Sequence, residues 1–170
     1  MGRVKPATQK RRRGFAARKG RKSTARSGAE FPFALELLRK AREARKLASA
    51  PYSRFRVGAA LLTATGDVIT GANVESVSYG LTCCAERIAL FKALTEGYSN
   101  FIGLAVVARV SGGPMPCGAC RQLLAEYAPQ ATIVVADSGT FRRFRTFAVQ
   151  ELLPGAFLKG PLSPRPPLLR

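Results

Sequence analysis

The sequence TCCAERIALF (residues 82–91) places two adjacent cysteines and a glutamate directly before an apolar run. PCGACRQLL (residues 116–124) has a similar layout, with two cysteines at the start of a second apolar run. Both patterns predict the first turn of a helix, where free backbone N–H groups and the helix dipole favour thiolates. Placing the two helix starts side by side would bring Cys84, Cys117 and Cys120 together in one site.

The segments around the two motifs alternate between helices and strands. We expect helices at 33–49, 84–96 and 117–128, because each apolar pattern has helical spacing and ends at a Pro or Gly. The predicted apolar faces are Leu37, Ala41, Ala44 and Leu47 in the first helix, and Ile88, Phe91 and Leu94 in the second.

The strands set the fold class. Residues 55–64 and 68–75 predict a β-hairpin, 101–110 and 131–137 predict buried strands, and 141–147 predicts a further strand before a short helix in VQELL. Strands joined by crossover helices indicate an α/β fold with helices on both sides of a mixed sheet. We therefore expect a three-layer α/β/α sandwich with a mixed five-stranded sheet.

Charge and proline content divide the chain of 170 residues into three parts. Residues 1–28 carry eleven Lys and Arg and no acid, which leaves +18 − 11 = +7 of the formal charge for the rest. Such a segment is expected to be disordered and to bind phosphate polymers non-specifically. It could instead be a solvated extension, the result of a start codon assigned too far upstream, or a mitochondrial transit peptide. Residues 29–158 form the predicted catalytic domain, and 159–170 form a Pro-rich tail.

The amino-acid composition limits both the cellular compartment in which the protein is expected and the groups that it can use for catalysis. The best apolar run, FIGLAVVA (101–108), ends at Arg109 and is far too short to span a bilayer. Four cysteines without a secretory signal are typical of a reducing compartment, so we expect a cytoplasmic protein whose thiols bind metal or stay free. The chain contains no His, which leaves carboxylates, thiols or a metal-activated water for proton transfer near neutral pH.

Three cysteines in this arrangement suit a catalytic zinc ion. Three protein ligands leave a tetrahedral zinc one open position, and Glu86 would lie beside it without being a ligand. Arg87 would donate hydrogen bonds to the thiolates and withdraw charge from them, unless it pairs with a surface acid. The alternatives are a redox dithiol at Cys117 and Cys120, or a closed structural site with Cys83 as fourth ligand. Glu86 could also serve only to complement the helix dipole.

The motifs together are more specific than any of them alone. The runs at 55–76, 83–97 (CCAERIALFKALTEG), 115–127 (MPCGACRQLLAEY) and 149–157 (VQELLPGAF) resemble the small homotetrameric zinc-dependent cytidine deaminases. The resemblance covers roughly residues 50–158. It implies a cytidine deaminase-like fold, one Zn²⁺ per subunit and a homotetramer.

The resemblance also implies roles for individual residues. Cys84, Cys117 and Cys120 match the zinc ligands, and Glu86 matches the residue that carries protons during the reaction. The remaining matches are Asn73 and Glu75 on the ribose, Phe55 in the pocket wall, and Tyr79 and Phe157 at a neighbouring subunit. Gln122 would support either the metal site or the packing of its helix. Without the resemblance, Asn73 and Glu75 would be a polar turn and the aromatic residues would more simply belong to the core.

The implied reaction is hydrolytic deamination of cytidine and 2′-deoxycytidine to uridine and 2′-deoxyuridine, a step of pyrimidine salvage. One alternative is another substrate, either a blasticidin-type antibiotic or a cytosine within a polynucleotide, and the basic tail favours the polynucleotide. A non-enzymatic alternative is a basic nucleic-acid-binding protein with a structural zinc. The expected partners are a nucleoside, further copies of the chain and, through residues 1–28, nucleic acid without sequence specificity, but no membrane.

Overall fold

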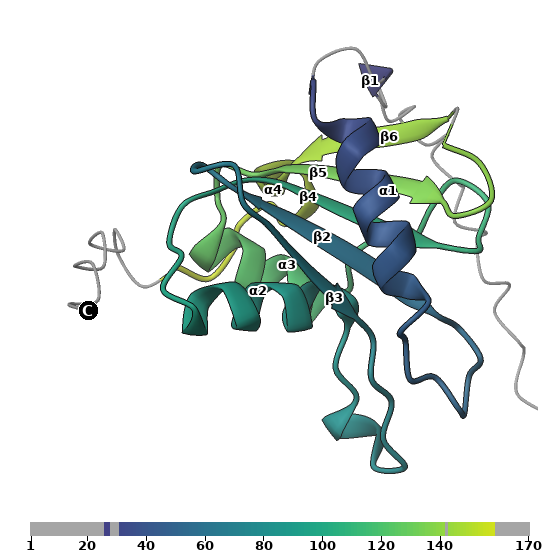
Figure 1. Ribbon diagram of the computed structural model, residues 1–170. Coiled ribbons are helices and arrows are strands. Elements are labelled where there is room, and N and C mark those ends of the chain that lie inside the picture. Colours follow the sequence, from purple (N-terminus) through teal and green to yellow (C-terminus); the bar gives the residue numbers. More distant parts are fainter. Residues whose placement is uncertain (1–25, 28–30, 142, 159–170) are drawn as a thin grey trace, which may run out of the picture.

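The computed structural model describes residues 26–27, 31–141 and 143–158, so the predicted tails lie outside the described residues except for Arg26–Ser27. A twisted sheet runs through the molecule with helices on both of its faces (Figure 1). Its strand order is β1-β6-β5-β4-β2-β3. The strands are β1 (Arg26–Ser27), β2 (Val57–Thr63), β3 (Val68–Ala72), β4 (Phe101–Ala108), β5 (Thr132–Asp137) and β6 (Phe144–Ala148).

The pairing confirms a mixed sheet. β2 and β3 form the predicted hairpin, and β2 also pairs antiparallel with β4. β4 and β5 are parallel, as expected for strands joined through a crossover helix, and β6 closes the set antiparallel to β5. The five predicted strands are all present. A sixth, β1, comes from two residues of the segment predicted as a tail and pairs with β6.

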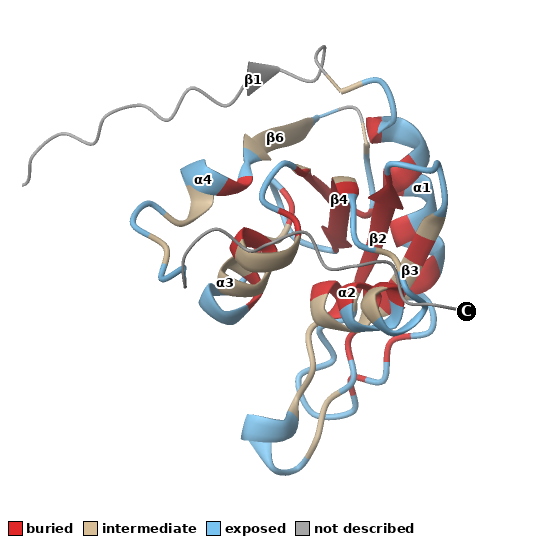
Figure 2. Cartoon of the chain, turned by 90° about the vertical axis from the view of Figure 1, so that its left-hand side faces the viewer, coloured by how far each residue is buried: buried red, intermediate tan, exposed pale blue. Residues whose placement is uncertain are grey.

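The helices divide between the two faces of the sheet. α1 (Ala34–Arg45) covers one face, while α2 (Ala85–Thr95), α3 (Gly118–Tyr127) and the short α4 (Val149–Leu152) cover the other. Side chains alternate along each strand, so Leu61 packs in the cluster under α2 and α3, and Leu62 packs in the cluster under α1. Figure 2 shows the buried central strands β2 and β4 between these layers. The α/β fold predicted from the sequence is therefore confirmed.

Two predicted helix faces are wrong in detail. α1 ends at Arg45, so Leu47 lies beyond the helix and is 82% exposed. In α2 the buried residues are Ala85, Glu86, Ala89, Leu90 and Ala93, while Phe91 is 41% exposed. The reason is a close approach, since a Cβ added at Gly71 of β3 would lie 2.4 Å from the carbonyl oxygen of Ala85. Small residues are therefore required where α2 meets the sheet.

An arm between β3 and α2 projects from the body of the molecule (Figures 1 and 2). Val74 and Cys83 join its two sides by exchanging backbone hydrogen bonds of 3.0 and 2.9 Å. The 3₁₀ helix η1 (Tyr79–Leu81) lies on the arm, and the side chain of Tyr79 is 82% exposed. The backbone pairing at Cys83 fixes the direction from which the chain enters α2 at Cys84. In the described part of the chain, none of the helices combines the length and apolar composition that crossing a bilayer requires.

Candidate active site

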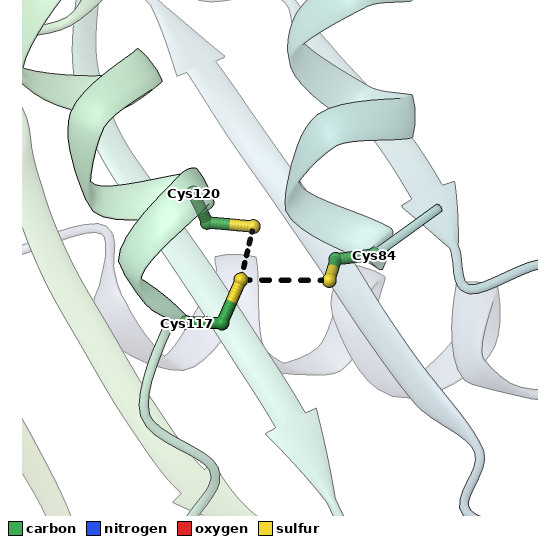
Figure 3. A group of neighbouring side chains, drawn as sticks. All are labelled: Cys84, Cys117 and Cys120. Atoms are coloured by element: carbon green, nitrogen blue, oxygen red, sulfur yellow. Dashed lines mark hydrogen bonds between the residues drawn. The ribbon is translucent and has the colours of Figure 1, made fainter. Parts of the chain in front are cut away.

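Three cysteine sulfurs meet between the N-termini of α2 and α3 (Figure 3). Cys84 and Cys117 each precede the first residue of their helix and have extended backbone conformations, with ψ of 152° and 169°. Cys120 lies in the first turn of α3. The Cys117 sulfur is 3.8 Å from the sulfur of Cys84 and 3.6 Å from that of Cys120. All three sulfurs lie within 4.8 Å of one another.

These separations fit a zinc ion. A tetrahedral zinc with bonds of about 2.3 Å to sulfur holds its sulfur ligands roughly 3.8 Å apart. Among the described residues, the group that could hold a metal ion contains Cys84, Cys117 and Cys120 and does not include Cys83. The backbone of Cys83 is instead paired with Val74, and burial raises the pKa of its thiol. The three sulfurs therefore provide an incomplete coordination shell, as at catalytic zinc sites.

The sulfur cluster favours a thiolate at Cys84. Hydrogen bonds from Cys120 first, then from Cys117 and Arg87, outweigh desolvation and lower the pKa of Cys84 to about 5. The interaction with Cys84 and burial raise the pKa of Cys120. Proximity to Cys84 thus makes the Cys120 thiol harder to ionise, and a bound cation would remove that obstacle because it neutralises the charge that accumulates on the sulfurs.

Glu86 is the buried carboxylic acid of the site. It occupies the second position of α2 and is only 5% exposed. Burial raises its pKa to about 7, and the negative charge of Cys84 contributes in the same direction. A carboxyl group in this state exchanges a proton readily near neutral pH, so Glu86 has the properties of a general acid and base.

Arg87 lies where the sequence predicted a charge beside the sulfurs. Its Nη2 atom donates a 2.5 Å hydrogen bond to the carbonyl oxygen of Thr82, and the guanidinium helps to lower the pKa of the Cys84 thiol. Its Nε atom is buried and has no hydrogen-bond partner among the described residues. Arg87 therefore holds the base of the arm and provides a positive charge that favours the Cys84 thiolate.

Asn73 and Glu75 form a second group with the segment that leads into β2. The Asn73 amide accepts a 2.8 Å hydrogen bond from the N–H of Val57 and donates a 3.0 Å bond to the carbonyl oxygen of Phe55. Glu75 accepts bonds from the backbone N–H groups of Tyr52 and Ser53 and from the Ser53 hydroxyl. These contacts explain the position of Phe55, whose side chain is exposed. Residues 73–75 do not form the polar turn that was the alternative from the sequence, and Glu75 instead stabilises the separate turn at residues 51–53.

Gln122 and Phe157 form a third group. The Gln122 amide nitrogen donates to the carbonyl oxygen of Phe157 at 2.6 Å and to the Glu126 carboxylate at 2.7 Å. Gln122 thus anchors the C-terminal segment to α3, while the Phe157 ring is left 83% exposed. Tyr79 stands apart from all three groups, on the projecting arm.

The sequence analysis missed Arg121. Its Nε atom donates a 2.7 Å hydrogen bond to the carbonyl oxygen of Pro116, and its Nη1 atom donates a 3.2 Å bond to that of Leu152. Arg121 therefore holds the residue that precedes Cys117 and connects α3 to α4. The available clue was its place directly after Cys120, which parallels that of Arg87 directly after Glu86.

Fold and site together define a class of protein: an α/β enzyme with a three-cysteine zinc site at two helix N-termini and a buried carboxyl group beside it. Residues 33–136 match the family described as the cytidine and deoxycytidylate deaminase zinc-binding region. The chain belongs to this family.

Individual relatives agree with this assignment. A cytidine deaminase of Halalkalibacterium halodurans is 52% identical over 121 residues, which cover 71% of this chain and 91% of that protein. The crystal structure of cytidine deaminase from Burkholderia pseudomallei matches with a TM-score of 0.69 at 46% identity, covering 72% of this chain and 98% of that one. The blasticidin-S deaminase of Bacillus cereus is 29% identical over 110 residues, or 60% of this chain and 76% of that protein.

Proposed function

We propose that this protein is a zinc-dependent cytidine deaminase that hydrolyses cytidine and 2′-deoxycytidine to uridine and 2′-deoxyuridine and releases ammonia. The observation that carries the proposal is the buried Glu86 beside three converging cysteine sulfurs. The similarity to cytidine deaminases at up to 52% identity supports the same activity.

Cys84, Cys117 and Cys120 hold the zinc ion, which when bound supplies a Lewis acid that activates water near neutral pH. Glu86 performs the proton transfers. With a pKa raised to about 7, it accepts a proton from the attacking water and passes it to ring nitrogen 3 of the base. Glu86 next takes the remaining proton from the hydroxyl group that water has added at carbon 4 and gives it to the amine, which leaves as ammonia while the carbonyl of the product forms. Burial serves both steps, because it keeps the carboxyl group close to the midpoint of its titration.

Arg87 supports the sulfurs by neutralising part of their negative charge. Three thiolates around a divalent cation carry a net charge of −1, which weakens the ion as a Lewis acid. The guanidinium beside Cys84 and the two helix N-termini draw electron density away from the sulfurs.

Asn73 and Glu75 bind the ribose, and Phe55 forms part of the pocket wall. The structural bonds of Asn73 use one donor and one lone pair of its amide, which leaves a second donor and a second lone pair. Both residues leave β3 on the same side of the chain, next to the segment before β2 that they stabilise. Their structural and binding roles are therefore compatible.

The protein works as a homotetramer in the cytoplasm, in pyrimidine salvage. Exposed apolar side chains support the assembly, since Tyr79 on the arm and Phe157 near the C-terminus are more than four-fifths exposed at 82% and 83%. A neighbouring subunit would cover them, and each would then reach a partner's nucleoside pocket. Gln122 keeps Phe157 in place for this contact. The basic residues 1–28 contact nucleic acid without sequence specificity.

The test combines metal analysis with substrate comparison. Purified protein should contain one zinc per subunit and convert cytidine and 2′-deoxycytidine, as followed by the ultraviolet absorbance of the product. Blasticidin S and a cytosine-containing oligonucleotide serve as competing substrates. Turnover of either one without turnover of free cytidine would contradict the proposal, and so would zinc-loaded protein that converts none of the four.

A further inference from the structure

Arginines gather on the side of the molecule that the active site does not use. α1 covers one face of the sheet, and α2 and α3, which carry the cysteines, cover the other. Arg39 and Arg42 lie three positions apart on α1, so they are neighbours on its surface, and both are exposed. A ligand on this side would leave the nucleoside site open.

Two of the arginines on α1 contact residues outside the helix. The Arg42 guanidinium lies 5.5 Å from the ring centroid of Phe141, which belongs to the segment before β6. At the other end of α1, Arg45 donates a 2.9 Å hydrogen bond to the carbonyl oxygen of Arg56. We define the α1 basic surface as Arg39, Arg42 and Arg45.

The arginines of this surface form no salt bridge among the described residues. α1 contains two acids, Glu36 and Glu43, and Glu43 is paired with Lys46 at 2.5 Å. Arg42 also acts on Glu43, since its positive charge helps to lower the pKa of that carboxyl group. Guanidinium groups outside salt bridges attract an anionic partner, because no internal salt bridge has to be broken for it to bind.

The most basic part of the chain precedes β1. β1 pairs with β6 through Arg26 with Thr146 and Ser27 with Arg145, and β6 follows Phe141 in the chain. The 25 residues before β1 contain ten Lys and Arg and no acid. The sequence therefore adds a second group of positive charges to those of α1.

We propose that the α1 basic surface binds the phosphate backbone of single-stranded nucleic acid. Guanidinium groups match phosphate oxygens through paired hydrogen bonds. Arg42 also lies over the half-buried ring of Phe141, and an arginine beside an aromatic ring is a combination typical of single-strand binding. This activity goes beyond nucleoside deamination and does not depend on it.

The test uses the full chain and a fluorescein-labelled oligothymidylate, which contains no cytosine and so is not a deamination substrate. Fluorescence anisotropy gives the affinity between about 50 and 200 mM salt. The double variant R39Q/R42Q removes two positive charges from the α1 basic surface. K92E on the opposite layer is the control, because it changes the net charge by the same two units at an exposed helix position.

We expect R39Q/R42Q to reduce the slope of log affinity against log salt by about 1.4, or 0.7 for each lost phosphate contact. K92E should keep the wild-type slope, and cytidine turnover should be unchanged in both variants. An equal loss of slope in K92E, or a wild-type slope in R39Q/R42Q, would overturn the proposal. Binding to phosphatidylserine vesicles is measured for the same variants. If R39Q/R42Q weakens vesicle binding and leaves oligothymidylate binding unchanged, the surface binds lipid and the proposal is wrong.

Discussion

The sulfur of Cys84 lies 3.8 Å from the sulfur of Cys117, although each belongs to the start of a different helix. The sheet brings them together. α2 approaches β3 at Gly71, and α3 is the crossover between the parallel strands β4 and β5. The site therefore depends on residues that direct these two helices as well as on those that bind metal or substrate.

Glu86→Gln should leave a folded, zinc-loaded protein whose turnover of cytidine falls by about 10²- to 10⁴-fold, because an amide cannot relay protons. Steady-state kinetics and metal analysis of the same preparation measure both quantities. Glu96→Gln, at the exposed end of the same helix, is the matched control and should keep wild-type rates. Equal rates for the two variants would remove Glu86 from the reaction.

Removing zinc with a chelator should abolish turnover and lower the midpoint of thermal unfolding, because the metal stabilises only the folded state. Alkylation followed by mass spectrometry should show Cys84, Cys117 and Cys120 protected in the holoprotein and reactive after chelation. Cys83 should react at the same rate in both, since it lies outside the sulfur cluster. Protection of Cys83 by zinc would instead indicate a closed four-cysteine site.

Arg87→Ala should retain zinc but lower kcat by roughly 10- to 100-fold, because the thiolates lose the charge that compensates them. The change also removes the donor to the carbonyl oxygen of Thr82 at the base of the arm. Arg87→Lys restores the charge without the forked geometry and should recover part of the rate. Unchanged kinetics in Arg87→Ala would show that the sulfurs need no such support.

Arg121→Ala should weaken zinc binding by about 10- to 100-fold, since Pro116 and Leu152 both lose the side chain that links them. Competition with a zinc-sensitive dye measures this affinity directly. Arg109→Ala, an exposed arginine after β4, is the control and should bind zinc like the wild type. If both variants bind zinc equally well, Arg121 does not position Cys117.

Gly71→Ala should lower the free energy of unfolding by about 1–3 kcal/mol, because the added methyl group meets the backbone of α2. The atoms it meets are the carbonyl oxygen of Ala85 and the nitrogen of Ala89, so the start of α2 must move away from the sheet. Turnover should fall with stability, as measured by denaturant unfolding and kinetics. Gly80→Ala is the control, since a methyl group there meets nothing within 4 Å.

Most of the fold was predictable because its signals are local. Near-continuous apolar runs indicated the buried strands, and the Gly or Pro after each helical pattern indicated the helix ends to within a few residues. Leu47 and Phe91 were wrongly predicted to be buried, because their burial depends on tertiary packing. An apolar residue at helical spacing is buried only if a partner surface faces it, and α2 turns its alanines to the sheet because Gly71 allows close approach.

Some residues of the candidate site could likewise be predicted from the sequence, and others could not. The metal-binding motifs were recognisable because Cys117 and Cys120 lie three positions apart, a spacing that a helix turns into proximity without further information. Arg121 was missed because its partners, Pro116 and Leu152, are recognisable only once α3 and α4 are packed together.

By itself, the sequence determined the chemical groups: the thiols, the carboxylic acid beside them, the lack of histidine and the strongly basic N-terminal segment. The tertiary structure alone decided which thiols converge, that Glu86 is buried enough for its pKa to rise to about 7, and that the arginines of α1 lie on the face opposite the cysteines. The reason is that desolvation and the distances between charges depend on packing between segments far apart in the chain.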